Sequence, residues 1–391
     1  MIENMENIQQ QIMTFVQDYE DEKAGRIDLH ERMLRSLEAP YQTMPDHDRV
    51  LGLLRQTFSE EDVRVWFAFP DFDYRNEPLL LEEAREKAAP EDRPGFTAAA
   101  EKLIEKEFLA QAPRKDGQMG YMRTYLLYLA FGSVLKNDHE PLTEAFIDWW
   151  IYVLQNNAHL RAPNAEHRVI PHQDSIAGTR EGNRISMGLE IPDTREVLPT
   201  DLADEVLRGV ECMALIDCVC RAATDARGIR PCDYPVEGVC FLFNEAAREA
   251  IQVGYGRQVT NEEGIELMHR LRDMGLVQVI SNAMRPLSMC NCCSCCCICL
   301  NTLARHDAYL AVPSRFIAVI DGEERCIGCG GCVTACQMSA VSLDPKATIQ
   351  AKECIGCGHC AAACPAGIIR MEVRPGAPMG PAVDALHRIY L

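Results

Sequence analysis

Two cysteine runs near the end of the chain have a spacing that suits iron–sulfur chemistry. Each run has the form C-x2-C-x2-C-x3-C, in which the first three thiolates bind one 4Fe–4S cluster and the fourth binds the other cluster. The two runs must therefore be considered together. We predict that one cluster is held by Cys326, Cys329, Cys332 and Cys364, and the other by Cys354, Cys357, Cys360 and Cys336.

The segment from about Glu323 to Met371 resembles the bacterial ferredoxin with two 4Fe–4S clusters. The resemblance includes glycines in both runs, which let backbone N–H groups approach cluster sulfides closely. It implies a domain that carries low-potential electrons. One departure is that Gln337 follows Cys336, where the family usually has proline. A pair of zinc sites is the alternative, but interlocked fourth ligands are not a zinc pattern.

A second field of cysteines lies upstream. Four cysteines fall within 23 residues, and seven more fall within the ten residues from Cys290 to Cys299. Packing does not explain this density, because adjacent cysteines point in different directions and cannot all be buried as small apolar side chains. We predict metal ligation by Cys218, Cys220, Cys232, Cys240, Cys290, Cys292, Cys293, Cys295 and Cys296, and leave the roles of Cys297 and Cys299 open.

The segment between the two halves of this field predicts a helix and a strand. Thr260 and Glu263 form a capping box, Gly275 closes the helix, and Leu276–Ile280 follows as a strand. This spacer would fold the second half of the field back onto the first. The eleven thiols would then hold one or two further iron–sulfur clusters, or one larger cluster.

Arg221 and Cys212 lie in or near this field but are not predicted metal ligands. Arg221 directly follows Cys220, and we predict that it binds the cofactor by donating to a cluster sulfide or to an anionic ligand. The alternative is an ordinary surface or salt-bridge arginine. Cys212, which we place on a helix running into Asp217, is the best candidate for a buried thiol that binds no metal.

The whole sequence predicts an α+β protein with three folded parts. A mostly helical, winged-helix-like domain is expected at residues 1–160, and a linker or wrapping segment at 161–199. A cysteine-rich iron–sulfur domain follows at 200–315, the two-cluster ferredoxin domain at 316–375 and a tail at 376–391. His167 and His172 lie in the linker and are expected to be surface residues rather than metal ligands.

The N-terminal part is expected to be helical because its apolar residues recur at helical spacing. Ile8–Tyr19 carries one such stripe, and Asp28 with Glu31 is placed like a capping box. Asp116-Gly117 predicts a hairpin turn after a helix, which is the outline of a winged helix. Buried or inter-domain packing is expected for Trp149 and Trp150. Further helices are expected at about 47–58, 79–88, 97–109 and 141–156.

Composition narrows the function classes. The 391 residues carry a formal net charge of −19, so we do not expect nucleic acid to be a partner. We expect a redox protein with a basic docking patch instead. All 20 cysteines follow residue 211, as expected for metal ligation in a reducing compartment. The N-terminus does not resemble a signal peptide, and the longest apolar run is too short to span a bilayer. We expect a soluble, cytoplasmic protein.

From Asp217 onward, the layout resembles ferredoxin-fused iron–sulfur proteins of anaerobic microorganisms. This resemblance covers roughly the C-terminal half and implies no particular reaction. The leading hypothesis is that low-potential electrons pass through the ferredoxin domain to or from the upstream site. The alternatives are a metal-centred reductase or oxidoreductase subunit with catalysis at Cys218–Cys299, and an iron–sulfur redox sensor. No nucleotide-binding glycine motif is evident.

Overall fold

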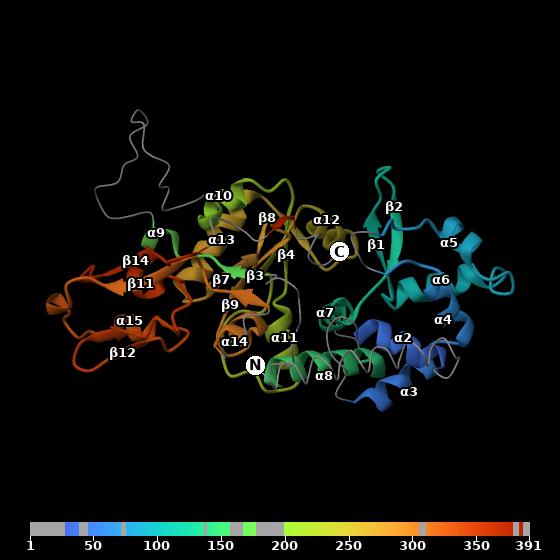
Figure 1. Cartoon of the computed structure of the whole chain (residues 1–391), viewed down its shortest axis with the longest axis horizontal. Helices are drawn as coiled ribbons and strands as arrows, with labels where there is room; N and C mark the ends of the chain where they lie inside the picture. Colours follow the sequence, from blue (N-terminus) through green and yellow to red (C-terminus); the bar gives the residue numbers. More distant parts are fainter. Residues whose placement is uncertain are drawn as a thin grey trace. The chain divides into compact units, whose positions relative to one another are not determined.

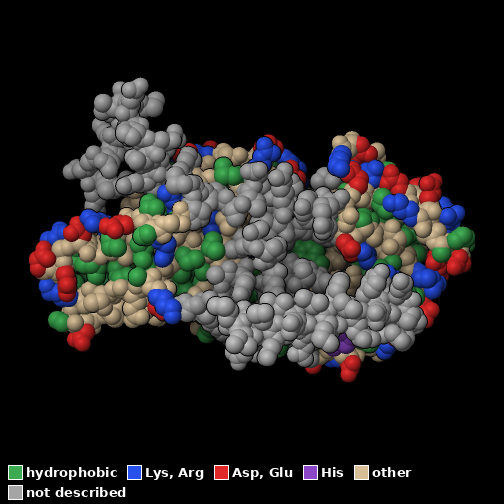
Figure 2. All heavy atoms as spheres, viewed as in Figure 1, with side chains coloured by type: hydrophobic (Ala, Val, Ile, Leu, Met, Phe, Trp, Pro, Cys, Tyr) green, Lys and Arg blue, Asp and Glu red, His purple; other side chains and the backbone are tan. Residues whose placement is uncertain are grey.

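The computed structural model describes residues 28–38, 46–71, 76–136, 139–156, 167–176, 199–304, 310–377 and 383–385. The chain divides into two units, one made of residues 1–133 and 138–149, the other of 134–137 and 150–391. Both contain helices and strands, which confirms the predicted α+β class (Figure 1). Acidic and basic side chains are interspersed on the visible surface (Figure 2). The predicted helix over Ile8–Tyr19 lies outside the described residues.

The first unit is mostly helical. Its elements are α2 (Leu29–Glu38), α3 (His47–Thr57), α4 (Glu60–Phe67), α5 (Leu81–Lys87), α6 (Phe96–Glu105), β1 (Leu109–Pro113) and β2 (Met119–Arg123). Two further helices, α7 (Leu126–Lys136) and α8 (Pro141–Asn156), contribute residues to both units. The helix-then-hairpin order agrees with the winged-helix outline, which stays a prediction.

Local signals explain most of these boundaries. Asp28 accepts a hydrogen bond from the backbone N–H of Glu31 at 2.9 Å, which is one half of the expected capping box, while the Glu31 carboxylate binds Arg35 and His47. The hairpin turn places Gly117 at φ 83°, where glycine avoids steric cost. Helix α6 stops at Glu105, earlier than expected, because Glu107 takes a φ of 63° and starts the hairpin. Trp149 and Trp150 are both buried.

A seven-stranded sheet forms the centre of the second unit. The strand order is β10 (Ala311–Val312), β3 (His167–Val169), β7 (Val277–Ser281), β9 (Ser288–Cys292), β5 (Cys240–Phe243), β4 (Met213–Ile216) and β6 (Arg257–Val259). Neighbouring strands are antiparallel except for the β10–β3 pair. Strands β4 and β7 are buried along their full length, as expected for strands that lie inside a sheet.

The helices of this unit follow the strands closely in sequence. They are α9 (Gln173–Ile176), the short 3-10 turn η1 (Pro199–Asp201), α10 (Ala203–Arg208), α11 (Val219–Ala226), α12 (Asn244–Gln252), α13 (Asn261–Asp273) and α14 (Ile298–Ala304). The capping box of α13 is present: the Glu263 N–H donates to the Thr260 hydroxyl at 3.2 Å, and the Thr260 N–H donates to the Glu263 carboxylate at 2.9 Å. Strand β7 then leads to β9, which pairs with β5. The spacer thus brings the second half of the cysteine field onto the first.

The predicted ferredoxin domain is built from two small antiparallel sheets. Strand β11 (Phe316–Ile320) pairs with β14 (Ile369–Val373), and β12 (Val341–Leu343) pairs with β13 (Ala347–Ile349). The turn η2 (Glu323–Arg325) precedes the first cysteine run, and the short helices α15 (Gly331–Thr334) and α16 (His359–Ala362) lie within the two runs. A separate pair joins β8 (Ala283–Arg285) to β15 (Val383–Ala385).

The structure corrects two expectations about the second unit. His172 is 8% exposed and is not a surface residue. Its ring lies 5.7 Å from the ring of His359, and its backbone N–H donates to the Cys357 carbonyl at 2.7 Å. His167 lies on β3, and burial lowers its pKa to about 4. Both histidines thus belong to the folded unit, although the sequence placed them in a linker.

Cys212 also differs from its prediction. It immediately precedes strand β4 rather than lying on a helix, and it is partly exposed rather than buried. Within the described part of the chain, no helix is long and apolar enough to cross a membrane.

Candidate metal centres

The first predicted cluster site of the ferredoxin domain is a pocket. Its lining includes Cys326, Cys329 and Cys332 from the first run and Cys364 from the second, together with apolar side chains such as Ile368. The fourth thiol therefore comes from the other run, as the C-x2-C-x2-C-x3-C spacing requires. A cavity lined by four thiols and apolar groups suits a 4Fe–4S cluster, which needs thiolate ligands and a dry shell.

The second predicted site gathers the other four thiols. Burial raises the pKa of the Cys357 thiol to about 12, and the charges of Cys336 and Cys354 act in the same direction. The Cys360 thiol has Cys357, Cys354 and Cys336 as neighbours. Ionising buried thiols that raise one another's pKa is unfavourable, but a bound metal neutralises the thiolate charge and removes this energetic cost. The donor set fits a second cluster, and the ligand roles stay predictions.

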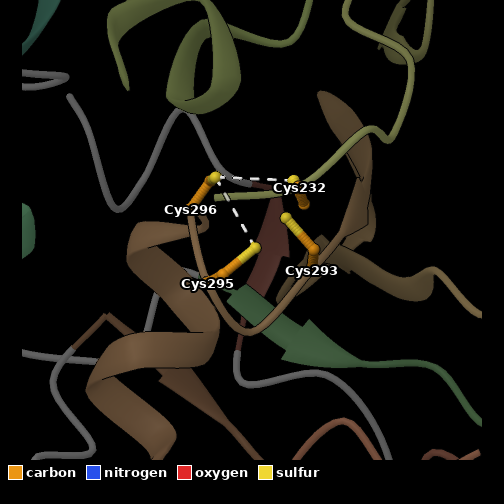
Figure 3. A group of neighbouring side chains, drawn as sticks. All are labelled: Cys232, Cys293, Cys295 and Cys296. Atoms are coloured by element: carbon orange, nitrogen blue, oxygen red, sulfur yellow. Dashed lines mark hydrogen bonds between the residues drawn. The ribbon is translucent and has the colours of Figure 1, made fainter. Parts of the chain in front are cut away.

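Four thiols upstream form a tight group, which we call the quartet: Cys232, Cys293, Cys295 and Cys296. Their sulfur atoms all lie within 4.8 Å of one another. The Cys296 sulfur lies 3.8 Å from that of Cys232 and 3.6 Å from that of Cys295 (Figure 3). Cys232 comes from the loop after α11, and the other three come from the turn after β9. Cys295 is exposed, so the quartet reaches the surface.

The remaining seven upstream thiols form a chain of neighbours, which we call the inner thiols: Cys218, Cys220, Cys240, Cys290, Cys292, Cys297 and Cys299. The Cys218 thiol neighbours Cys240, which neighbours Cys290 on the adjacent strand. The Cys297 thiol donates to Cys292 at 3.0 Å and also neighbours Cys220 and Cys299. All seven are buried or partly buried. Cys297 and Cys299, whose roles the sequence left open, thus lie among the predicted ligands.

Arg221 is buried among these thiols, with 1% of its surface exposed. Its Nη1 donates to the Asn291 carbonyl at 3.2 Å and to the Cys293 sulfur at 3.7 Å. Its Nε and Nη2 have no hydrogen-bond partner among the described residues. Burial alone would lower its pKa, but the charges of nearby thiols, Cys218 first, raise it above its usual value. The surface alternative is therefore wrong, and the guanidinium points two free donors into a thiol-rich interior.

A buried amide network fixes the strand end that carries these thiols. Asn291 is completely buried; its Nδ2 donates to the Val239 carbonyl at 2.8 Å, and its Oδ1 accepts from Gln278 Nε2 at 3.1 Å. The network ties β9 to β7 and to the loop before β5. Sequence reasoning missed Asn291 and Gln278, because two polar residues in buried strands match no periodic pattern.

Gln337 connects the ferredoxin domain to the quartet. Its Oε1 accepts hydrogen bonds from the Ser294 N–H at 3.2 Å and from the Ser294 hydroxyl at 3.0 Å. Its Nε2 donates to the Tyr234 hydroxyl at 3.1 Å and to the Gly275 carbonyl at 2.9 Å. The residue that departs from the ferredoxin pattern thus makes four hydrogen bonds to the upstream region. A proline could make none of them.

Comparison with known proteins supports the C-terminal site alone. A family model described as a 4Fe–4S dicluster domain matches residues 325–372. No curated protein and no solved structure matches the chain. The match begins just before Cys326 and ends after Cys364, so it contains all eight cysteines of the two runs.

Proposed function

We propose, from the premise that residues 325–372 form a ferredoxin-type 4Fe–4S dicluster domain, that the protein transfers electrons between this domain and an upstream metal–thiolate site. The upstream site would be held by the quartet and the inner thiols. When bound, iron–sulfur clusters supply one-electron redox chemistry over a range of roughly −700 to +450 mV.

The observation that carries the proposal is the Gln337 bridge. Gln337 follows Cys336, the predicted fourth ligand of the second cluster, and it hydrogen-bonds Ser294. Ser294 in turn lies between Cys293 and Cys295 of the quartet. Residues next to predicted ligands of two metal sites are thus joined through one amide side chain, and such contact supports electron transfer between the sites.

The first ferredoxin site and the inner thiols differ in their exposure to solvent, and this difference suggests where a redox partner would dock. Around the first ferredoxin site, Cys329 is exposed and Ile327 is 70% exposed, so an external redox partner could approach there. The inner thiols are buried or partly buried beside Arg221, and this burial limits their contact with water. Electrons would therefore enter at the exposed ferredoxin site, while the inner thiols of the upstream site are shielded from solvent.

A substitution at the bridge tests the proposal. Anaerobically purified, iron-loaded protein would be reduced with dithionite, and reduction of each metal site would be followed by rapid-freeze EPR. We expect slower reduction of the upstream site in Gln337→Ala than in wild type. Gln350→Ala, an exposed glutamine of the same domain, should leave the rate unchanged. An upstream site that the wild-type ferredoxin domain cannot reduce would contradict the proposal.

A second candidate, a metal-centred reductase, is favoured by a groove whose lining includes the residue before Cys218. The groove has a cavity volume of about 740 Å³ and is lined by Asp217, which precedes Cys218, and by charged residues that include Glu237 and Arg270. Small-molecule sites have volumes of about 300–1,000 Å³. A small polar molecule that binds there and shifts the EPR signal of the upstream site would favour this candidate; no shift with any ligand that binds would count against it.

A further inference from the structure

The sulfur spacing of the quartet matches the coordination shell of one metal ion. In a tetrahedral thiolate site, metal–sulfur distances of about 2.3 Å place neighbouring sulfur atoms about 3.8 Å apart. The sulfur of Cys296 lies 3.8 Å from that of Cys232 and 3.6 Å from that of Cys295, and both distances are close to this value. All four sulfur atoms stay within 4.8 Å of one another.

The ferredoxin cysteines provide an internal standard for a cluster. A 4Fe–4S cluster has four irons at separate corners of a cube, each with its own outward-pointing thiolate, so its thiolates stand farther apart than those around one ion. Among the described residues, the eight ferredoxin cysteines form no group of three or more thiols within 4.8 Å. The same chain therefore contains a wide thiol arrangement and a tight one.

We propose that Cys232, Cys293, Cys295 and Cys296 bind a single divalent metal ion in tetrahedral thiolate coordination, and not an iron–sulfur cluster. Iron and zinc both favour four thiolates in this geometry. Iron would let the quartet itself carry electrons, whereas zinc would leave electron transfer to the inner thiols. The inference rests on the proposed upstream metal site and changes what occupies its outer part. The inner thiols, which include no comparably tight group among the described residues, remain the candidate ligands of a further cluster.

The charges around the quartet suit this occupant. Four thiolates and a divalent ion carry a net charge of −2, which is costly in a partly buried site unless cations lie nearby. Arg221 donates to the Cys293 sulfur at 3.7 Å, and Arg230, two residues before Cys232, also pairs with Asp225 at 2.8 Å. Two arginines thus lie near the quartet, and Arg221 contacts one of its sulfur atoms. Cys295 is exposed, which allows the ion to enter from solvent.

The turn that carries three of the ligands is held by hydrogen bonds. The Ser294 N–H and hydroxyl donate to Gln337, and the Ser294 carbonyl accepts from Asn301 Nδ2 at 3.2 Å. Because Ser294 is hydrogen-bonded to both Gln337 and Asn301, the turn holds the thiols on either side of Ser294 in one arrangement. Such preorganisation favours one ion with fixed geometry.

Metal and acid-labile sulfide counts test the inference on anaerobically purified full-length protein. In wild type, total metal should exceed sulfide by about one per chain, because each cluster iron is matched by one sulfide. Cys232→Ser should remove that one metal ion and no sulfide. Cys295→Ser, at an exposed thiol, repeats the test where misfolding is less of a risk, and Cys212→Ser is the matched control that should leave both counts unchanged.

Spectroscopy identifies the ion and gives a second measurement. Iron should give the high-spin ferric EPR signal of a mononuclear site after mild oxidation. Zinc is silent, but cobalt added in its place should give thiolate charge-transfer bands that Cys232→Ser abolishes. Loss of metal and sulfide in equal amounts would show that the quartet binds a cluster. That result would overturn the single-ion proposal but leave the proposed upstream redox site intact. No metal loss in either serine variant would overturn both the inference and the quartet's part in the proposed function.

Discussion

The ferredoxin domain and the upstream cysteine field hold thiols in opposite ways. In the ferredoxin domain, the cysteines are regular in sequence and widely spaced in the structure. In the upstream field, the cysteines are irregular in sequence, yet four of them form a tight group and seven form a connected chain. A regular motif therefore identifies a large cofactor from the sequence, whereas a small coordination shell assembled from separate segments becomes visible only after folding.

The two regions also differ in what surrounds the thiols. Small apolar residues and cysteines make up the ferredoxin core, whose buried members are Ala318, Cys332, Ala340, Val341, Ala347, Cys354, Cys360, Ala361, Cys364, Ile368 and Ile369. The upstream thiols instead border a seven-stranded sheet whose central strands are mostly buried and apolar. We infer that the ferredoxin domain depends on its cofactors for folding, and that the upstream region depends on them less.

The largest expected effect comes from removing one ferredoxin ligand. Cys354→Ala should cost about four irons per chain, the content of one cluster, and should destabilise the surrounding domain because cluster binding supplies folding free energy. Iron analysis and limited proteolysis of residues 316–375 would measure the two effects. Cys212→Ala should change neither. A variant that keeps full iron content and protease resistance would contradict the assumed role of Cys354.

A smaller effect is expected at the buried arginine of the upstream field. Arg221→Met should lower the free energy of unfolding by about 3 kcal/mol, because it leaves buried thiolate charge without a compensating cation. Anaerobic denaturant unfolding would measure this loss, with Arg248→Met on the exposed face of α12 as control. Equal stability of the two variants would show that the upstream thiols carry no charge needing compensation.

The amide network should contribute less again. Asn291→Leu removes the partners of the Val239 carbonyl and of Gln278, and buried polar groups left unpaired cost about 1–3 kcal/mol. Denaturant unfolding should show this loss, and the quartet should hold its ion less tightly because the strand end before Cys293 is less well fixed. Gln252→Leu, at an exposed position of α12, is the control. Unchanged stability and metal affinity would argue against a positioning role.

The smallest effect is expected in the first unit, where no described residue is a cysteine. Burial lowers the pKa of His47, but hydrogen bonds to Glu31 at 3.0 Å and Glu38 at 3.2 Å raise it above 6.5 overall. A raised folded-state pKa gives stability that is present below pH 6.5 and is lost as pH rises through the folded-state value. The contribution should be under about 1 kcal/mol for these partly exposed groups.

Hydrogen exchange of the α2 and α3 amides across this pH window would measure it. His47→Gln should remove the pH dependence, and metal removal should leave it intact. A pH response that disappears when metal is removed would show that the first unit senses the metal sites.

Local signals in the sequence predicted many elements of the fold. The capping box at Thr260–Glu263, the turn at Gly117 and the helix over Pro141–Asn156 depend on neighbours in the chain, so the sequence is sufficient to find them. The helix expected at Cys212 was wrong: strand β4 begins at the next residue, and a short buried strand and a helix segment can share the same apolar composition.

The sequence by itself determined the ferredoxin domain. Its eight thiols stand at fixed short spacings within two runs, so local chain geometry and one crossing between runs are enough to specify the sites. Tertiary structure alone decided how the upstream field is divided. Cys232 lies 61 positions or more from the other quartet members in the sequence. Tertiary contacts, among them the pairing of β5 with β9 and the Gln337 bridge, bring the separate segments together. Such long-range contacts depend on sheet order and on buried hydrogen bonds, which leave no periodic signal in the chain.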